Sequence, residues 1–169
     1  MEDNLIGVGL HLGSGKIKWD KWLNIDYNKA ADVCCDIKKL DFLANNTADI
    51  AVSIHVIEHF YEWEVVPLLK EWYRVLKPGG KIVLELPCME KVLNHIYLCM
   101  QNKLPISPSM GWFVFWGDPK YNDPHMGHKW GYTKPMIQAK LEEAGFKDVK
   151  FESPRYHFEI RDMRVEAYK

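Results

Sequence analysis

The sequence lacks a long hydrophobic run, a targeting segment and an excess of charge of either sign. Its uninterrupted apolar runs are far shorter than the roughly 18 to 20 residues of a membrane span. The acidic start "MEDN" has no basic region followed by an apolar core, the pattern of a secretory signal. The formal net charge is -1, which leaves no overall field for phosphate backbones or anionic membranes. We therefore expect a cytoplasmic protein that binds neither nucleic acid nor a membrane.

The sequence also lacks a CxxC motif, since none of its four cysteines occurs in that spacing. Reduced thiols in a cytoplasm are the expected state of such residues. A chain of 169 residues, of which 47% are hydrophobic, buries a core without disulfides or a structural metal. We expect a single domain over residues 1–169 and no metal among its site residues.

Short apolar runs and helical patterns alternate along the chain. Apolar residues at 3.6-residue spacing predict a helix over 64–77, before Pro78-Gly79-Gly80. Thr133 is expected to cap a second helix that ends at Gly145. Apolar runs bounded by turn residues predict strands at 5–12, 22–27, 31–35, 49–55 and 81–86, with an antiparallel pair at 148–152 and 163–168.

This alternation favours the α/β class. Strands that alternate with helices form a mainly parallel sheet with helices on both faces, and the final pair adds an antiparallel edge. In open sheets of this kind, ligands bind beyond the carboxyl ends of the strands, at the topological switch point. The residues that end each strand are therefore the candidates for a site.

Gly13 and Gly15 follow the first predicted strand, where they allow the backbone to approach a ligand closely. A dinucleotide fingerprint needs GxGxxG and an acid about 20 residues further on. Here "KIK" follows Gly15, and Asp26 comes early. The pattern disfavours a pyrophosphate and favours a nucleoside without phosphates.

Two acids end the next two predicted strands. Asp26 is placed to accept hydrogen bonds from a ribose diol, or else it forms a turn before Asn28. Asp36 is placed to accept a bond from an exocyclic amine while Ile37 packs on the base, or else it caps a helix in "IKKLDFL". Their order along the chain is more informative than either acid alone.

Four segments follow one another in a characteristic order: "LHLGSGKIKWDKWLNIDYN", "DVCCDIKKLDF", "ADIAVSIHVIEHF" and "KEWYRVLKPGGKIVLELP". This series resembles the motifs of class I S-adenosylmethionine-dependent methyltransferases, particularly the compact type-11 group, over roughly residues 6 to 87. The later segment "WGYTKPMIQAKLEEAGFKDVKFES" is similar to the last helix and strand hairpin of that family. The resemblance implies a Rossmann-like, three-layer α/β/α fold whose seven-stranded sheet has its last strand inserted antiparallel.

The resemblance also implies a cofactor, S-adenosylmethionine, which leaves as S-adenosylhomocysteine. Gly13 and Gly15 would contact its methionine part, Asp26 its ribose, and Asp36 with Ile37 its adenine. The remaining residues of the implied cofactor set are Leu12, Ser14, Tyr27, Ile54 and His55.

The resemblance places His55 opposite the sulfonium end of the cofactor and the methyl acceptor, with Glu58 and His59 in the next turn. We take these three as candidate catalytic residues. His55 is the candidate general base because histidine titrates near neutrality, and its alternative role is a hydrogen-bonded wall of the pocket. Residues 55–59 also match the HxxEH pattern of inverted zinc hydrolases, which requires both histidines in one helix.

Residues 88–130 form an insertion, placed as a lid or an acceptor-binding region. The candidate substrate-binding residues are Trp112, Phe113, Trp116, His125 and His128; the alternative is a satellite core or a dimer surface. The arginines of the tail alternate with acids and predict a solvated edge.

Two departures from the family pattern bear on function. Few residues separate Gly13 from the second predicted strand, so the first helix is expected to be reduced to a turn or loop. The N-terminal helical cover is missing, so the pocket is either more open or completed by another subunit, for which a homodimer is one arrangement. The expected function is methyl transfer to a small-molecule or sugar-like acceptor. The alternative is a catalytically degenerate cofactor-binding partner subunit.

Overall fold

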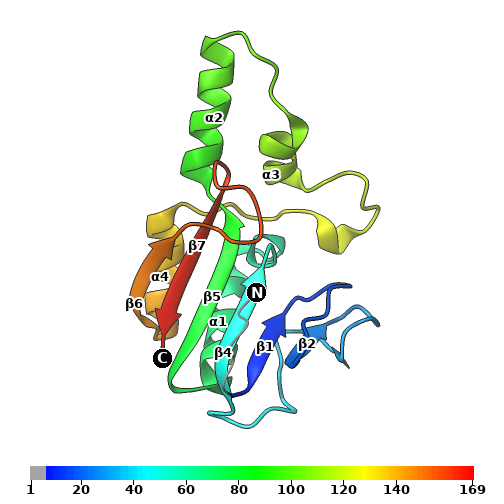
Figure 1. The fold of residues 1–169 in the computed structure, drawn as a ribbon, viewed down its shortest axis with the longest axis vertical. Coiled ribbons are helices and arrows are strands. Elements are labelled where there is room, and N and C mark those ends of the chain that lie inside the picture. Colours follow the sequence, from blue (N-terminus) through cyan, green and yellow to red (C-terminus); the bar gives the residue numbers. More distant parts are fainter. Residues whose placement is uncertain (1–6) are drawn as a thin grey trace.

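The computed structural model describes residues 7–169, and its centre is a seven-stranded mixed sheet (Figure 1). The strand order is β3-β2-β1-β4-β5-β7-β6. The first five strands pair in parallel, and β7 lies antiparallel between β5 and β6. The order reverses between β1 and β4, which makes the carboxyl ends of these strands the topological switch point. The strands are β1 (Gly9–Leu12), β2 (Trp22–Asp26), β3 (Val33–Cys34), β4 (Ala48–Ile54), β5 (Leu76–Pro87), β6 (Lys147–Glu152) and β7 (Asp162–Tyr168).

This topology confirms the α/β, Rossmann-like fold class expected from the sequence. Each predicted strand corresponds to an observed one, although residues 5 and 6 of the first prediction lie outside the described residues. The observed helices are α1 (Glu62–Val75), α2 (Met89–Gln101), α3 (Trp112–Trp116) and α4 (Lys134–Ala144), with short 3-10 turns at Ile57–His59, Pro108–Met110 and Pro124–Met126. Within residues 7–169, no helix has the length and apolar character needed to span a membrane.

Capping groups and backbone conformation at single residues set the ends of helices α4 and α1. The Thr133 side chain accepts a hydrogen bond from the Met136 amide at the start of α4, and Gly145 ends this helix in the left-handed conformation at φ 106°. Helix α1 starts two residues before its predicted position and ends at Val75, because Leu76 is already extended and begins β5. These ends fix where β5 and β6 enter the sheet.

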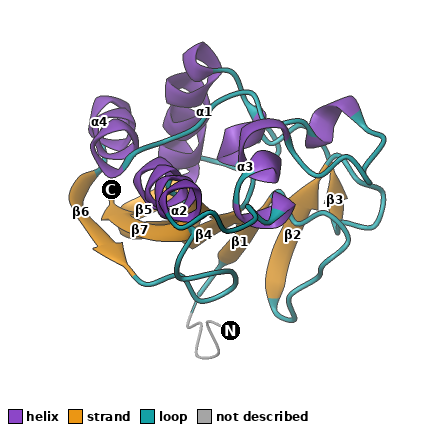
Figure 2. Ribbon diagram, turned by 90° about the horizontal axis from the view of Figure 1, so that it is seen from above, coloured by secondary structure: helices purple, strands orange, loops and turns teal. Residues whose placement is uncertain are grey.

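Helices α1 and α4 cover one face of the sheet (Figure 2). The sequence predicts helices on both faces, but the described crossovers after β1, β2 and β3 contain no helix. Nine residues join β1 to β2, counted from Leu12 to Trp22, fewer than a helical crossover needs. The expectation that the first helix is reduced to a turn is therefore confirmed.

On the opposite face of the sheet, aromatic side chains pack where a helix would otherwise cover the strands. The Trp19 ring stacks on His11 at 4.0 Å and on Tyr156 at 5.3 Å between ring centroids. Trp19 also packs against a small second core of Trp22, Ile50, Val52 and Val83. The main core lies on the helical face, where Trp72 of α1 is fully buried.

The predicted solvated edge is wrong for Arg161, Asp162 and Arg164, which are buried, whereas Glu152, Arg155 and Glu159 are exposed. Arg164 and Asp162 have no exposed surface, and Arg161 retains only 9%. The reason is topological, because β7 is an inner strand between β5 and β6 rather than an edge. Arg164 pairs with Glu85 of β5, Nη1 to Oε1 at 3.2 Å, and both side chains are fully buried.

The insertion projects from the carboxyl end of β5 as an arm made of α2 and α3 (Figure 1). Cys88 and Tyr132 form an isolated bridge at its base. The segment after α3 then returns towards the sheet and carries the 3-10 turn Pro124–Met126. The insertion therefore leaves and rejoins the body beside the strand ends.

Candidate active site

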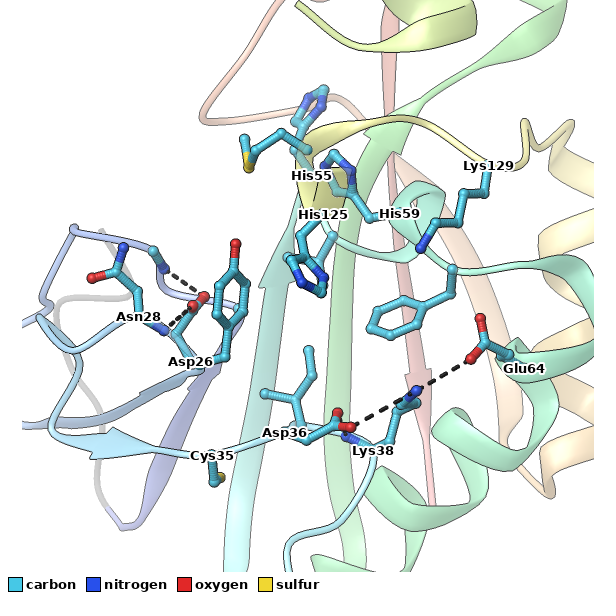
Figure 3. A pocket seen from close by; sticks show the side chains of 17 residues that line it. Asp26, Asn28, Cys35, Asp36, Lys38, His55, His59, Glu64, His125 and Lys129 are labelled. Carbon is cyan, nitrogen blue, oxygen red and sulfur yellow. Dashed lines mark hydrogen bonds and ion pairs between the residues drawn. The ribbon is translucent and has the colours of Figure 1, made fainter. Parts of the chain in front are cut away.

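A cavity of about 510 Å³ lies at the carboxyl ends of the parallel strands, where the sequence places the ligand site (Figure 3). This volume is within the range of small-molecule sites, roughly 300 to 1,000 Å³. Its walls come from the β1–β2 turn, the segments after β2, β3 and β4, helix α1, and the returning part of the insertion. The lining residues are Gly13, Gly15, Asp26, Tyr27, Asn28, Cys35, Asp36, Ile37, Lys38, His55, Val56, His59, Phe60, Glu64, His125, Met126 and Lys129.

Gly13 and Gly15 shape the first wall because both have positive φ, at 75° and 57°. Two amides of this turn, those of Gly13 and Ser14, donate to the Ile25 carbonyl, which fixes the turn against β2. A side chain at Gly13 would lie 2.3 Å from Val56, whereas a Cβ on Gly15 would meet nothing within 4 Å. Gly13 is therefore needed for packing, and Gly15 leaves open space at the cavity.

Asp26 ends β2 and links two parts of the cavity wall. Its Oδ2 accepts from the Gly15 amide at 2.8 Å, and its Oδ1 accepts from the Asn28 amide at 2.7 Å. The carboxylate is 7% exposed. A carboxylate oxygen has two acceptor positions, so each oxygen retains one for a ligand. Asp26 thus combines its turn-forming role with a binding-competent position.

Asp36 and Ile37 form the wall after β3. The Asp36 Oδ1 accepts from the Lys38 amide at 2.9 Å, and the Ile37 carbonyl accepts from the buried Trp72 indole at 3.0 Å. Segment 35–47 contains no helix, so Asp36 closes a local turn instead of capping one. Ile37 is buried at the cavity wall, where it offers an apolar surface.

His55 lies directly after β4 with φ 52°, in the left-handed region that a non-glycine residue rarely occupies. Its Nδ1 is 2.9 Å from Glu58 Oε1, and its Nε2 is 3.5 Å from Asp162 Oδ1 and 3.3 Å from Arg161 Nη2. Burial alone lowers the pKa of His55, but the Glu58 and Asp162 carboxylates outweigh it and raise this pKa above its usual value. His55 is therefore held by charged neighbours at the cavity wall.

Behind His55, the 3-10 turn Ile57–His59 carries two more candidate catalytic residues. Glu58 is only 2% exposed, and His59 lines the cavity. Burial by itself raises the pKa of Glu58, but neighbouring histidines, above all His55, lower it overall. His55 directly follows a strand and His59 lies in a separate short turn, so 55–59 does not form the single helix that an HxxEH zinc hydrolase requires.

The returning insertion closes the cavity opposite the strand ends. Tyr27 donates from its hydroxyl to Asp123 at 3.0 Å, and its ring lies 4.9 Å from that of His125. Lys129 contacts the turn after β4, because its amide donates to the Glu58 carbonyl at 2.8 Å. These contacts make residues 123–129 part of the site.

The structure separates the predicted site residues into two groups. Most strand-end residues line the cavity, as does His125. The others do not: Leu12 is buried in the core, Ser14 is buried in the turn, Ile54 packs on the second core, Glu58 is buried behind His55, and Trp112, Phe113, Trp116 and His128 are absent from the lining. Trp112 and Trp116 stack at 6.1 Å on the arm, with 47% and 67% of their surfaces exposed. Their binding roles stay predictions.

Several wall residues were not predicted from the sequence. Lys38 and Glu64 form an ion pair at 3.2 Å across the cavity edge, and Phe60 follows the histidine-rich turn. The sequence could have indicated Lys38 and Phe60, because each directly follows a predicted site residue, Ile37 and His59 respectively. Arg161 and Asp162 gave no such signal, since they reach His55 from the far end of the chain.

A sequence segment and the overall fold of this chain are similar to those of known proteins. Residues 10–84 match the family model described as a methyltransferase domain. Similar solved structures include two SAM-dependent methyltransferases. One is from Methanosarcina mazei, with TM-score 0.65, 17% identity, and coverage of 96% of this chain and 92% of that one. The other is from Archaeoglobus fulgidus, with TM-score 0.62, 18% identity, and coverage of 96% and 86%.

A third similar structure, from Bordetella parapertussis, is described as a possible exported protein. It has TM-score 0.60 and 19% identity, and the match covers 96% of this chain but only 61% of that one. No curated protein matches the sequence. The family match and the shared fold confirm the resemblance to class I methyltransferases of the type-11 group.

Proposed function

We propose that this chain, whose residues 10–84 match the methyltransferase family, transfers a methyl group from S-adenosylmethionine to a small-molecule or sugar-like acceptor. The main support is that the glycine turn, Asp26, Asp36 and Ile37 all line one cavity at the topological switch point of the sheet. The proposal treats residues 1–169 as one domain with an insertion at 88–130.

The volume of the cavity and the chemistry of its lining support an adenosyl cofactor. Asp26 retains an acceptor position on each oxygen after its two backbone bonds, which suits the two hydroxyls of a ribose. Ile37 and Phe60 give apolar walls for a base, and Asp36 gives an acceptor for its amine. The open space at Gly15 suits the methionine part, and Tyr27 closes the wall next to Asp26.

The residues near His55 would act at the acceptor. When bound, S-adenosylmethionine supplies a methyl group that is already activated by a positively charged sulfur, so positioning dominates the chemistry. His55 would orient the acceptor from the end of β4, and Asp162 with Arg161 would hold its ring. Glu58 is a positioning residue in this scheme because it contacts His55 from a buried position.

Three features favour a small or sugar-like acceptor. The cavity volume limits the size of the ligand. His55, His59, His125 and Lys129 line its wall and provide hydrogen-bonding groups suited to hydroxyls. In the proposed arrangement the α2–α3 arm acts as a lid, on which Trp112, Phe113 and Trp116 contact the acceptor and His128 supports the returning loop. A homodimer is part of the same proposal.

A cytoplasmic location is part of the same proposal. The four cysteines, Cys34, Cys35, Cys88 and Cys99, are free thiols, as is usual in a reducing compartment.

Replacing His55 by alanine tests the proposed acceptor site. We expect kcat for methyl transfer to fall at least about tenfold, while the affinity for S-adenosylhomocysteine changes little because Asp26 and the glycine turn remain. The measurement is formation of S-adenosylhomocysteine with a panel of small hydroxylated and amine acceptors. His95→Ala on the arm is the matched control. Unchanged turnover in His55→Ala would remove His55 from the mechanism, and cofactor binding without turnover on every acceptor would favour a degenerate partner subunit.

A further inference from the structure

Three potential metal ligands from distant parts of the sequence meet behind the cavity wall. Glu58 and His59 come from the turn after β4, and His128 comes from the returning insertion. One ligand atom of each residue lies within 4.8 Å of the others. The rings of His59 and His128 meet edge to face at 4.8 Å between centroids. This spacing is compatible with three ligands around one ion.

Backbone carbonyls set the orientation of both rings. The His59 Nδ1 lies 3.2 Å from the Gly127 carbonyl, and the His128 Nδ1 lies 2.8 Å from the Val114 carbonyl. A carbonyl only accepts, so each Nδ1 carries the proton and each Nε2 keeps a free lone pair. A histidine that binds a metal typically donates its other ring N–H in this way. The two rings are therefore held in the tautomer that a metal requires.

Glu58 supplies the negative charge. It is 2% exposed, and among residues 7–169 neither of its carboxylate oxygens has a hydrogen-bond partner of acceptable geometry. Oε1 faces His55 at 2.9 Å as an ion pair. The buried carboxylate has one charged partner, His55, and one ligand atom each of His59 and His128 also lies within 4.8 Å of it. The cluster is rich in acceptors and suited to a cation.

We propose that Glu58, His59 and His128 bind one divalent transition-metal ion of the zinc type. Two imidazoles with one carboxylate suit zinc and its neighbours rather than magnesium or calcium, which prefer oxygen ligands. Three protein ligands also leave a coordination position open. His55 is not a ligand in this site, which distinguishes it from the HxxEH arrangement and departs from the metal-free site expected from the sequence.

The ion would join two parts of the site. The amides of Lys129 and Trp130 already donate to the Glu58 carbonyl, at 2.8 and 3.3 Å, and a shared metal would strengthen this link. His59 lines the cavity, so the ion lies at the wall near His55. If the proposed methyltransferase function holds, the open position would orient a donor atom of the acceptor. Metal binding itself does not depend on that function.

The test is titration of the chelator-treated full chain with Zn²⁺ and Co²⁺ by calorimetry, with the Co²⁺ absorption spectrum as a second readout. We expect one ion per chain and a Co²⁺ spectrum with nitrogen ligation. Glu58→Gln and His128→Asn should each weaken binding at least about tenfold, because loss of a second-shell partner alone costs that much. His128→Asn retains a side-chain N–H for the Val114 carbonyl, and His95→Asn is the matched control with wild-type affinity.

Failure of the wild type to bind either ion, or equal binding by wild type, Glu58→Gln and His128→Asn, would overturn the metal site. A thermal melt of each variant establishes that it is folded. S-adenosylhomocysteine binding, measured on the same metal-free samples, reports the proposed function separately. Intact cofactor binding without metal binding would refute only the metal site, and the converse would refute only the cofactor site.

Discussion

Replacing Asp26 by alanine is expected to weaken S-adenosylhomocysteine binding by about 1.5 to 3 kcal/mol, or roughly tenfold to 150-fold. Hydrogen bonds to a charged group contribute this much, and Asp26 has an acceptor position left on each oxygen. The substitution also removes the acceptors of the Gly15 and Asn28 amides, which loosens the turn that borders the cavity. Calorimetric titration of wild type and variant measures the loss.

A second ligand separates ribose recognition from loosening of the turn. An analogue of S-adenosylhomocysteine without the ribose hydroxyls should bind more weakly than the parent to the wild type, but about equally to Asp26→Ala. This double comparison isolates the coupling between carboxylate and diol. Equal affinity of wild type and variant for the parent ligand would show that Asp26 serves only the turn.

Replacing Arg164 by methionine should destabilise the fold by about 3 to 5 kcal/mol, because it leaves the Glu85 carboxylate buried without its cation. Both side chains are fully buried, and Glu85 also accepts from the Arg155 and Tyr156 amides at 2.8 and 3.1 Å. Glu85 thus holds the segment that leads to Arg161 and Asp162 beside His55. Urea denaturation measures the change in the free energy of unfolding.

The matched variants are Glu85→Gln and the double variant that combines Arg164→Met with Glu85→Gln. Removal of both charges should cost less than the sum of the single changes, because Glu85 is then not left charged without Arg164. Glu166, which also pairs with Arg164 at 2.8 Å, keeps its ion pair with Lys81 in every variant. A loss below about 1 kcal/mol in Arg164→Met would mean that this pair behaves like an exposed surface ion pair.

Much of the sheet could be predicted from local pattern. Thr133 and Gly145 marked both ends of α4 because capping and left-handed turns depend on single residue types. Helix α2 was not predicted, although Val92, Leu93, Ile96 and Cys99 fall at the 3.6-residue spacing of a helix face. Only Val92 and Cys99 of this face are buried, because the arm projects away from the sheet and Leu93 stays exposed (Figure 1).

The proposed cofactor end of the cavity was predictable for a topological reason. Parallel strands present their carboxyl ends at one edge, so Asp26, Asp36 and His55 had to approach one another. The proposed acceptor end depends on tertiary contacts between distant segments, which a local sequence pattern does not show. Asp162 reaches His55 because β7 is inserted into the sheet, and the burial of charges along that strand contradicts what its composition suggests.

The most direct test of the account is calorimetric titration of the purified wild-type chain with S-adenosylmethionine and with S-adenosylhomocysteine. We expect micromolar binding of both ligands at one site per chain. Absence of binding to either ligand at millimolar concentration would contradict it, and would mean that the cavity beside Asp26 is not an adenosyl-cofactor site.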